Sequence, residues 1–539
     1  MTDKIGIGTQ LNKWLSKGTV MGPLCDSIIS TKNVTINRLF GVPKPNGDTR
    51  PILDLSDKTD TGFSVNDCLF ERVCTVEYAQ TREVVEIVQA LGKNAWLWAK
   101  DLEDGYYNVS IFESDIYNLG FSFENEKYVF MRLPMGLSSS PHIFTEFMHF
   151  PLWAIKNDKP ELYYINIPSN NFNPNNFRND SDIKYDPYTD TYRIAVIFYY
   201  LDDILGGHID EKEAKEQYKH SEEILIKLNL KTKTVKGKPP KQIQKWLGKM
   251  YDTINQWIKL PTEKVEKYIK SMRELINKKT VTQRELLSHI GRTRHMGSIY
   301  RPLSAFARNL EVWAYSVVGL YTHINIKNAL REDLKLCVWA MLEANKYGVS
   351  FEFFLKPMDN PDITLYTDAS LLIGIGGISD KGHWFKNMWT DITLHNMEYR
   401  DIIWKELCAV FVFVHALRHH LKQKVVHIYT DNEPVKFMLI SMRSKLYRPD
   451  LQILINKICK YSIKYQFHLW IEHIPGKNNI IPDALSRNFV NPFKSDNHTI
   501  YNKQINTTDS LQYASNLCKD IKINEKHLKF EDDDFYCLI

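Results

Sequence analysis

The chain has 539 residues, 43% of them hydrophobic. It is too long to fold around a single hydrophobic core, and its length indicates about three to five domains. The net charge is +5, but residues 227–308 hold 14 lysines and 6 arginines against 5 acidic residues. This local surplus favours a polyanionic partner such as nucleic acid over an ordinary solvated helical surface.

The N-terminal sequence MTDKIGIGTQLNKWLSKG lacks the apolar segment of a secretory signal. No apolar run approaches the roughly 20 residues that cross a bilayer, and the nearest is LCAVFVFVHAL at 407–417. The eight cysteines form no CxxC pair, which argues against a zinc knuckle or a disulfide framework. We therefore expect an intracellular protein that is not secreted and has no transmembrane segment.

The first candidate site consists of three aspartates. Asp101 ends the apolar segment WLWAK (96–100), and Asp202 and Asp203 follow the apolar run IAVIF (194–198) in YYLDDILGG. Unpaired carboxylates at buried strand ends are costly, but three of them can hold divalent metal, and two Mg²⁺ ions can activate a hydroxyl and stabilise a pyrophosphate leaving group. Spacing alone leaves an alternative open, in which Asp101 caps a turn and the other two begin a hairpin.

The middle of the chain mixes irregular and periodic segments. Residues 157–193 are polar, Asn-rich and interrupted by prolines, which indicates an insertion or mobile loop. We expect this segment to be disordered; the alternative is a contact surface for the template or a partner. Apolar spacing predicts helices over 262–279 and 282–296, and two prolines in 356–362 predict a linker.

The pattern changes after residue 361. It predicts a strand ITLYTD, a glycine-rich strand GIGGIS, a helix over 404–420 and a strand over 425–431. From Asn488 onward the sequence is polar, and we expect a flexible tail.

Four acids in this last region form a second candidate site. Asp368 and Asp431 close strands, Glu406 lies in the predicted helix, and Asp483 opens the helical segment PDALSR. Such acids can converge on two metal ions. Individually they have structural alternatives, since Asp431 and Asp483 can cap helices and Glu406 can lie at the surface.

Five motifs carry a resemblance to reverse transcriptases. LFGVPKPNGDTRPILDLS, KDLEDGYYNV, LPMGLSSSPHIF, YYLDDIL and KWLGKMY occur in the order found in that family, over about 210 residues. The resemblance implies a multidomain α+β right hand with fingers and palm over 1–256, including the 157–193 insertion, and a thumb over 257–310. It implies that Asp101 and Asp202 bind two Mg²⁺ ions, or Mn²⁺, and that Asp203 completes the cluster in a tight YLDD hairpin.

The same resemblance implies contacts to substrate and primer. Tyr106 matches the aromatic gate that excludes a ribose 2′-OH, and Lys44 and Arg50 match the cations that hold the triphosphate. Gly136 leaves room for close backbone approach, while Met135 offers no side-chain hydrogen bond. The hairpin that grips the primer is matched by Trp246, Leu247 and Gly248. Lys236 lies near the family's late-palm lysine, an acid for the leaving pyrophosphate, and Lys233 is the alternative for that role.

The second site resembles a ribonuclease H domain fused behind a retroelement polymerase. This resemblance rests on the four acids together with EHIPGKNNIIPDALSR (472–487). It implies a connection over 311–360, an α/β ribonuclease H-like domain over 361–490 and a tail over 491–539. The interval from Asp368 to Glu406 suits three strands and a helix, and the family's four acids bind two Mg²⁺ ions that activate water. His473 lies in the strand-like LWIEHI, which favours a structural role over that of a mobile catalytic histidine.

A narrower resemblance concerns the retroelement class. Asp60, Thr61 and Gly62 spell the aspartic protease triplet but lack its sequence context. The SVND run after DLS, with GTVMGPL and VTQRELLSHIGRTRHM, instead resembles DIRS-like (tyrosine-recombinase) retrotransposons. A polymerase of the long-terminal-repeat or pararetrovirus type is the alternative.

These observations predict an RNA- and DNA-directed DNA polymerase with ribonuclease H activity. Its expected partners are an RNA template, a DNA primer, an RNA–DNA hybrid and dNTPs, and no membrane is expected among them. The expected location is the cytoplasm, the nucleus or element-encoded particles. The alternatives are a polymerase whose ribonuclease H is inactive and a non-enzymatic nucleic-acid-binding or structural subunit. The presence of all seven acids favours an active enzyme. The sequence leaves the oligomeric state and the priming mechanism open.

Overall fold

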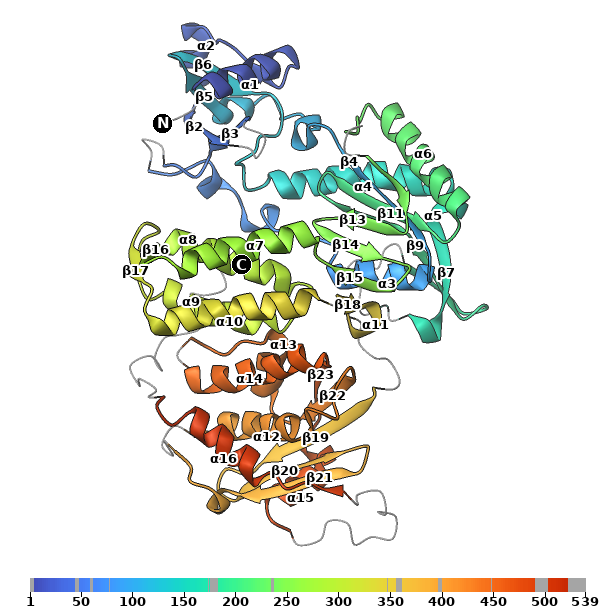
Figure 1. Ribbon diagram of the computed structural model, residues 1–539. Coiled ribbons are helices and arrows are strands. Elements are labelled where there is room, and N and C mark those ends of the chain that lie inside the picture. Colours follow the sequence, from blue (N-terminus) through green and yellow to red (C-terminus); the bar gives the residue numbers. More distant parts are fainter. Residues whose placement is uncertain are drawn as a thin grey trace. The chain divides into compact units, whose positions relative to one another are not determined.

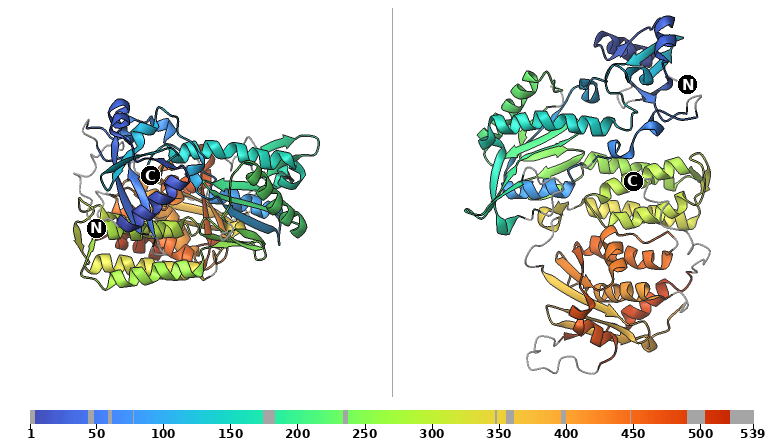
Figure 2. Two further views of the ribbon diagram at one scale, coloured as in Figure 1. Left: turned by 90° about the horizontal axis from the view of Figure 1, so that it is seen from above. Right: turned by 180° about the vertical axis from the view of Figure 1, so that it is seen from behind.

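The computed structural model describes residues 4–43, 48–58, 62–76, 78–172, 174, 183–233, 237–346, 348–354, 361–395, 400–446, 448–489 and 503–521. The chain divides into two compact units, Met1–Gln256 and Trp257–Ile539 (Figures 1 and 2). Four residues that the sequence singled out, Lys44, Asp60, Thr61 and Lys236, lie outside the described residues.

The first unit begins with a five-stranded sheet in the order β1-β6-β5-β2-β3. Helix α1 packs on this sheet because its apolar positions, Ile7, Leu11 and Trp14, are buried together. The elements are α1 (Lys4–Ser16), β1 (Val20–Met21), α2 (Asp26–Lys32), β2 (Ile36–Pro43), β3 (Thr49–Asp54), β5 (Gly120–Phe123) and β6 (Glu126–Phe130).

A second sheet of this unit, in the order β10-β11-β4-β12, carries the first three aspartates. Its strands are β4 (Trp96–Asp101), β10 (Ile197–Tyr200), β11 (Asp203–His208) and β12 (Lys238–Lys241). The helices beside it are α3 (Thr81–Leu91), α4 (Ser140–Asp158) and α6 (Glu211–Lys227). The core between sheet and helices includes Trp98, Ile204, Phe144 and Leu225, all fully buried.

The expectation of a mobile loop over 157–193 is wrong for the described residues. After α5 (Pro160–Tyr163), three strands form an antiparallel sheet in the order β7-β9-β8: β7 (Tyr164–Pro168), β8 (Ile183–Asp186) and β9 (Thr191–Ala195). Ile167 and Ile194 are buried there. The apolar residues of these strands are few and spaced among Asn and Pro, so composition concealed a sheet that forms by pairing across the segment.

The first unit ends in a hairpin of β13 (Ile243–Trp246) and β14 (Lys249–Asp252). The second unit opens with four packed helices: α7 (Thr262–Ile276), α8 (Gln283–Gly297), α9 (Leu303–Ala314) and α10 (Asn328–Asn345). The predicted helices over 262–279 and 282–296 are therefore confirmed. Short elements accompany them: β15 (Trp257–Lys259), β16 (Thr280–Thr282), β17 (His323–Asn325), β18 (Val349–Ser350) and α11 (Phe351–Phe354).

The rest of the second unit is built on a six-stranded sheet in the order β23-β22-β19-β20-β21-β24. Strands β19, β20 and β21 pair antiparallel in succession, and β22 and β23 add in parallel. The predicted three strands followed by a helix are confirmed, because α12 follows β21. The elements are β19 (Ile363–Ala369), β20 (Gly374–Ser379), β21 (His383–Met388), α12 (Ile402–Leu417), β22 (Val425–Thr430), α13 (Glu433–Ser441), α14 (Pro449–Tyr465), β23 (His468–His473) and α15 (Ile480–Ser486).

The expected flexible tail from Asn488 is partly wrong. Strand β24 (Lys503–Gln504) pairs in parallel with β21, and α16 (Thr508–Leu517) packs on α12. Leu511 and Ala514 are fully buried in that contact. Residues 356–360 of the expected linker, and the stretches 490–502 and 522–539, lie outside the described residues. Within the described ranges no helix is long and apolar enough to cross a bilayer.

Candidate active sites

The first site lies where β4 meets the β10–β11 hairpin. Asp203 pairs directly with Asp101 in antiparallel register, and Tyr200 pairs with Asp203. Leu201 and Asp202 are therefore the two residues of a tight turn, in which Leu201 has a φ of 52°. The predicted YLDD hairpin is confirmed, and it brings all three carboxylates to one end of the sheet. The alternative, in which Asp101 caps a turn and the other two aspartates begin a hairpin, does not explain why Asp101 lies beside that hairpin.

The three carboxylates lie in an environment that favours added positive charge. Burial, followed by the charges of Asp202 and Asp101, raises the pKa of Asp203 to about 6. The Lys233 amine donates to Asp101 and lies 3.6 Å from Asp202 Oδ2. Burial opposes the charge of this lysine, but the two carboxylates raise its pKa overall. A set of hard oxygen ligands that already attracts one cation fits a divalent metal such as Mg²⁺.

Tyr106 lies beside these acids, in a short 3-10 helix at Gly105–Asn108. Its half-buried ring packs edge-on against Phe144, with centroids 5.4 Å apart. Burial, together with the charges of nearby groups that include Asp202, raises the pKa of Tyr106. A further ring, that of Tyr78, lies 4.2 Å from the ring of Tyr200, and sequence reasoning missed this contact.

Arg50 and Gly136 take different positions. Arg50 is exposed on β3 opposite Val42, and its charge reaches the hydroxyl of Tyr107. Gly136 has a φ of 113°, and a Cβ there would lie 1.9 Å from the Leu53 carbonyl oxygen. Backbone crowding therefore requires this glycine whether or not a nucleotide approaches it.

The expected primer-grip residues form the turn between β13 and β14. Leu247 and Gly248 both have positive φ, 47° and 71°, the combination that a type I′ hairpin needs. Trp246 pairs with Lys249 and is 1% exposed, so its indole anchors the hairpin in the core. The turn residues Leu247 and Gly248 are partly exposed, unlike the indole.

The second site brings three acids together in the C-terminal sheet domain. Oxygens of Asp368 at the end of β19, Glu406 on α12 and Asp431 after β22 all lie within 4.8 Å of one another. The Ala369 N–H donates to Glu406 Oε1 at 3.2 Å, whereas Glu406 Oε2 is buried with no hydrogen-bond partner among the described residues. An orphaned buried carboxylate oxygen that faces two other acids fits a metal ligand.

Electrostatics at this cluster point the same way. Burial, followed by the charges of Asp368 and Asp431, raises the pKa of Glu406 to about 9. Burial is also the main reason why the pKa of Asp368 rises to about 6, despite the hydrogen bond that Ser486 donates to it. A cation bound here would remove this penalty by favouring the charged carboxylates.

The fourth predicted acid, Asp483, lies on α15 and outside the three-acid cluster. Arg487 Nε donates to Asp483 Oδ1 at 2.8 Å, and the charge of Asp483 adds to the raised pKa of the three clustered acids. Sequence reasoning missed the roles of Ser486 and Arg487, although both lie in the motif PDALSR.

The structural alternatives for these acids are wrong. Asn432, not Asp431, caps α13 by accepting from the Val435 N–H, and Glu406 is 4% exposed. Asp483 lies inside α15 instead of at its cap. His473 ends β23, as predicted, and its Nε2 lies 3.1 Å from the Asp431 carbonyl oxygen.

Part of the chain is similar to known proteins. Residues 42–250 match the family model for reverse transcriptase (RNA-dependent DNA polymerase). The retrovirus-related Pol polyprotein from transposon opus of Drosophila melanogaster is 32% identical over 130 residues, 22% of this chain and 12% of that protein. The Pro-Pol polyprotein of Simian foamy virus type 3 (strain LK3) is 25% identical over 142 residues, 26% of this chain and 11% of that protein. The chain thus matches a small part of each relative's length.

Two solved structures are similar at low identity. The foamy viral protease-reverse transcriptase in complex with RNA/DNA hybrid aligns with a TM-score of 0.48 and 16% identity, covering 87% of this chain and 53% of that chain. Its dRH form in complex with double-stranded DNA aligns with a TM-score of 0.47 and 17% identity, covering 87% and 69%. The family match spans Asp101, Asp202 and Asp203, which the fold brings together. Residues 42–250 are therefore similar to the reverse transcriptase family, and the family match covers this part of the chain alone.

Proposed function

We propose that this chain is an RNA-directed and DNA-directed DNA polymerase that also degrades the RNA strand of an RNA–DNA hybrid. The observation that carries the proposal is the presence of two separate acid clusters. One, at Asp101, Asp202 and Asp203, lies within the residues that match the reverse transcriptase family model. The other, at Asp368, Glu406 and Asp431, lies in a different sheet of the second unit.

In the polymerase site, Asp101, Asp202 and Asp203 would hold Mg²⁺ or Mn²⁺. The metal, when bound, would help to ionise a primer 3′-OH and neutralise the leaving pyrophosphate. Lys233 holds Asp101 and Asp202 in place before substrate arrives, and its position suits proton donation to the leaving group. The Tyr106 ring restricts space beside Asp202, which supports a role in excluding the ribose 2′-OH.

Substrate contacts are assigned by position. Arg50, with Lys44, would hold the triphosphate, because an exposed guanidinium binds phosphate oxygens in pairs. The turn at Leu247 and Gly248 would meet the primer end, anchored by Trp246. The lysines and arginines of 227–308 would contact duplex phosphates without reading sequence.

In the second site, Asp368, Glu406 and Asp431 would hold metal, and Asp483 would complete the set from α15. The metal would supply an activated water for cleavage of the RNA strand. Ser486 orients Asp368 by donating a hydrogen bond to it, and Arg487 orients Asp483. A ribonuclease H-like domain over 361–490, with a connection over 311–360, is the corresponding domain assignment.

The proposed partners are an RNA template, a DNA primer, their hybrid and dNTPs, at an intracellular location. The SVND run at 64–67 supports a DIRS-like retroelement as the source, and Asn66 of this run has a visible role. It donates to the Gly136 carbonyl oxygen at 3.0 Å and accepts from the Ser138 N–H at 2.9 Å. The run thus fixes the loop that follows LPMG.

One assay tests both activities. The protein is incubated with Mg²⁺, dNTPs and a primer on an end-labelled RNA template, and both strands are followed on one gel. Asp202→Asn should abolish primer extension and leave hybrid cleavage, whereas Glu406→Gln should do the reverse, because the acids belong to separate clusters. Glu113→Gln, an exposed acid outside both clusters, is the matched control. Extension by Asp202→Asn at the control rate would contradict the polymerase assignment, and intact RNA with the unchanged protein would contradict the nuclease assignment.

A further inference from the structure

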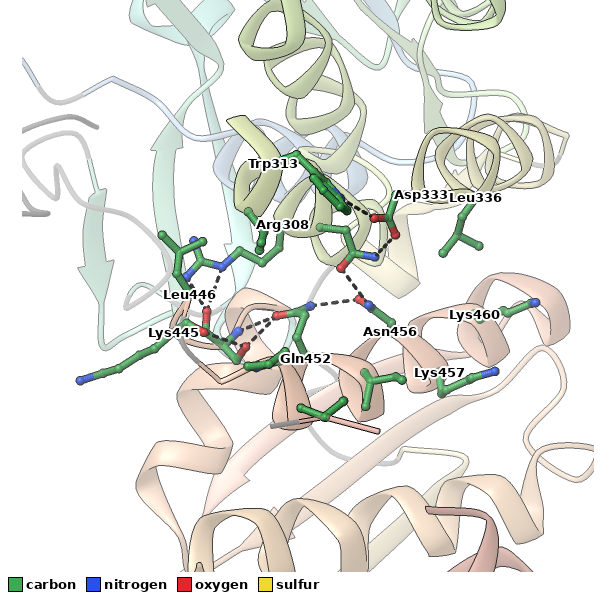
Figure 3. A pocket seen from close by; sticks show the side chains of 16 residues that line it. Arg308, Trp313, Asp333, Leu336, Lys445, Leu446, Gln452, Asn456, Lys457 and Lys460 are labelled. Atoms are coloured by element: carbon green, nitrogen blue, oxygen red, sulfur yellow. Dashed lines mark hydrogen bonds between the residues drawn. The ribbon is translucent and has the colours of Figure 1, made fainter. Parts of the chain in front are cut away.

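A chain of hydrogen bonds in the second unit lines a cavity of about 440 Å³ between α9, α10 and α14 (Figure 3). Asp333 accepts from Trp313 Nε1 and Asn309 Nδ2, both at 2.9 Å. Asn309 Oδ1 accepts from Asn456 Nδ2 at 2.9 Å, and Asn456 Oδ1 accepts from Gln452 Nε2 at 3.0 Å. These bonds join three helices and end at the cavity wall, which fits a structural role. A polar network in the first unit differs because it leads to the first acid cluster.

That network begins at Lys100 on β4, the residue before Asp101. The Lys100 side chain is only 1% exposed, and its amine donates to Glu222 on α6. The same amine lies 3.8 Å from the centroid of the Tyr218 ring. Because a buried charge without a partner is strongly destabilising, Lys100 and Glu222 fix each other between β4 and α6.

Glu222 also binds Thr232. The Thr232 hydroxyl donates to the Glu222 carboxylate, at 2.7 Å from Oε1 and 2.9 Å from Oε2. The next residue is Lys233, whose amine contacts Asp101 and Asp202. Successive side chains of an extended segment point to opposite sides. The threonine therefore meets α6 on one side, while the lysine meets the acids on the other.

The backbone on either side of this threonine is bonded to the end of β4 and the residues after it. The Lys233 N–H donates to the Asp101 carbonyl oxygen at 2.8 Å, and the Lys231 carbonyl oxygen accepts from the Glu103 N–H at 2.7 Å. These two bonds fix the register of the segment, but they leave it free to rotate about its own axis. The bond to Glu222 opposes this rotation, which would carry the lysine amine away from the acids.

We propose that Glu222 is a positioning residue for DNA synthesis, which acts through Thr232 to hold the Lys233 amine against Asp101 and Asp202. The proposal rests on the polymerase function proposed above, in which this amine keeps the two carboxylates in place before substrate arrives. Neither Glu222 nor Thr232 belongs to the acid cluster, so their effect on the reaction passes through Lys233. A misplacement of about 1 Å at reacting groups can cost on the order of 10²-fold in rate.

The first measurement detects the position of the amine without any activity. Reductive methylation of the full-length protein with limiting formaldehyde, followed by mass spectrometry, gives the labelling of Lys233 relative to exposed Lys231. Thr232→Val removes the hydroxyl and keeps the size of the side chain. This variant should raise the relative labelling of Lys233 several-fold, because an amine released from the acids is open to the reagent. Thr232→Ser, which keeps the hydroxyl, should behave like the unchanged protein.

Two further variants separate positioning from general destabilisation. Lys100→Met with Glu222→Leu removes the whole contact without leaving a buried charge unpaired, and it should raise the labelling as Thr232→Val does. Tyr163→Phe is the matched control. The Tyr163 hydroxyl is buried and donates to the Gln217 carbonyl oxygen of the same helix α6 at 2.9 Å, so its removal weakens α6 packing without touching Thr232. This control should leave the labelling ratio unchanged.

The second measurement is single-turnover addition of one dNTP to a DNA primer on an RNA template with Mg²⁺, normalised to the fraction of protein that binds the primer–template. Thr232→Val should lower the maximal rate roughly 10- to 100-fold and leave the apparent Kd for the dNTP within about twofold, because the contact acts on the reacting groups. Thr232→Ser should restore the rate, and Tyr163→Phe should keep it.

The outcomes separate this proposal from the polymerase function. An unchanged labelling ratio in Thr232→Val, or an equal rise in Tyr163→Phe, would overturn the positioning of Lys233 whether or not the protein extends a primer. A raised ratio with an undiminished maximal rate would overturn its role in synthesis. Failure of the unchanged protein to extend any primer would instead contradict the polymerase function, and with it the role in synthesis.

Discussion

Asp101 and Asp203 lie opposite each other on neighbouring strands, and Asp202 lies in the turn that joins β10 to β11. Repulsion among the three is eased by one amine, that of Lys233, which contacts Asp101 and Asp202. At the second site no amine enters the cluster of described acids, and the pKa of Glu406 rises to about 9. A lysine thus lies beside the first cluster, whereas burial and the charges of Asp368 and Asp431 raise the pKa of Glu406 in the second.

Tyr106→Ala should admit ribonucleotides. The ring packs on Phe144 beside Asp202, so its removal opens space where a ribose 2′-OH would lie. Relief of a steric block of this size should raise kcat/KM for an rNTP relative to its dNTP by roughly 10–200-fold. Steady-state primer extension with each nucleotide measures the ratio, with Tyr106→Phe as the control that keeps the ring. An unchanged ratio in the alanine variant would remove the gate assignment.

Gly136→Ala should destabilise the first unit by about 1–3 kcal/mol or more, because the new Cβ would lie 1.9 Å from the Leu53 carbonyl oxygen at a φ of 113°. Gly291→Ala, in the middle of α8, meets nothing within 4 Å and should instead stabilise its helix by about 0.5–1 kcal/mol. Urea denaturation of both variants measures the difference. Equal stability of the two would show that the Gly136 backbone is not confined as described.

At the scale of elements, α8 shows how local sequence defines a helix start. Thr282 accepts from the Glu285 N–H at 3.2 Å, and the Glu285 carboxylate accepts from the Thr282 N–H at 2.9 Å, which is a capping box. Apolar residues at helical spacing, Leu286 and Ile290, then face the core. Cap and periodicity agree, so the predicted start at residue 282 lies within one residue of the observed helix.

Thr282→Ala should lower the stability of the second unit by about 1 kcal/mol, because the Glu285 N–H loses the Thr282 hydroxyl as its acceptor. Thermal unfolding followed by circular dichroism measures the change, and Thr282→Ser, which keeps the hydroxyl, should retain most of the stability. A serine variant as unstable as the alanine variant would point to packing instead of capping.

The same box predicts a pH dependence. Hydrogen bonds from Thr282 and the contact with Lys278 lower the pKa of Glu285 from 4.5 to about 2. Its stabilisation is therefore fully present above pH 4.5 and is lost as the pH falls toward 2. The stability difference between the unchanged protein and Glu285→Gln should stay constant above pH 5 and shrink below pH 4.5. A difference that grows on acidification would have the wrong sign for this linkage.

At the scale of the whole molecule, charge is distributed unevenly. The +15 surplus of 227–308 lies in a chain whose net charge is +5, so the remaining residues are net negative. An acidic remainder repels nucleic acid while the basic segment attracts it, which favours duplex contact with residues 227–308 over the rest of the chain.

Binding of an RNA–DNA hybrid should weaken steeply with salt. A protein that contacts 6–10 phosphates loses roughly 10³–10⁵ in affinity between 50 and 200 mM salt. Lys267→Gln with Lys270→Gln, on exposed positions of α7, should reduce the slope of log K against log salt by about 1–2. Lys335→Gln on α10 lies outside the basic segment and serves as the control. Equal slopes for the unchanged protein, the α7 double variant and the Lys335→Gln control would exclude α7 from the duplex contact.

Elements that depend on short-range sequence patterns could be predicted from the sequence. The YLDD hairpin needs only a two-residue turn between apolar strands, α8 needs a cap and a period, and the strands around Asp368 and Asp431 are short apolar runs. All seven candidate acids were identified from such local motifs. Each of these features depends on residues within one turn or strand, where intrinsic preference and hydrophobic pattern act in the same direction.

Only the tertiary structure decided features that depend on distant contacts. Ser486 reaches Asp368 across 118 residues, and Lys233 reaches Asp101 across 132. The sheet within 157–193 and helix α16 gain stability from surfaces that their own polar sequences do not reveal. The sequence by itself determined which residues are candidates for the chemistry, because motifs are local. The fold decided which of them meet, how deeply they are buried and what neutralises them, because burial and charge contacts form between segments that the chain keeps far apart.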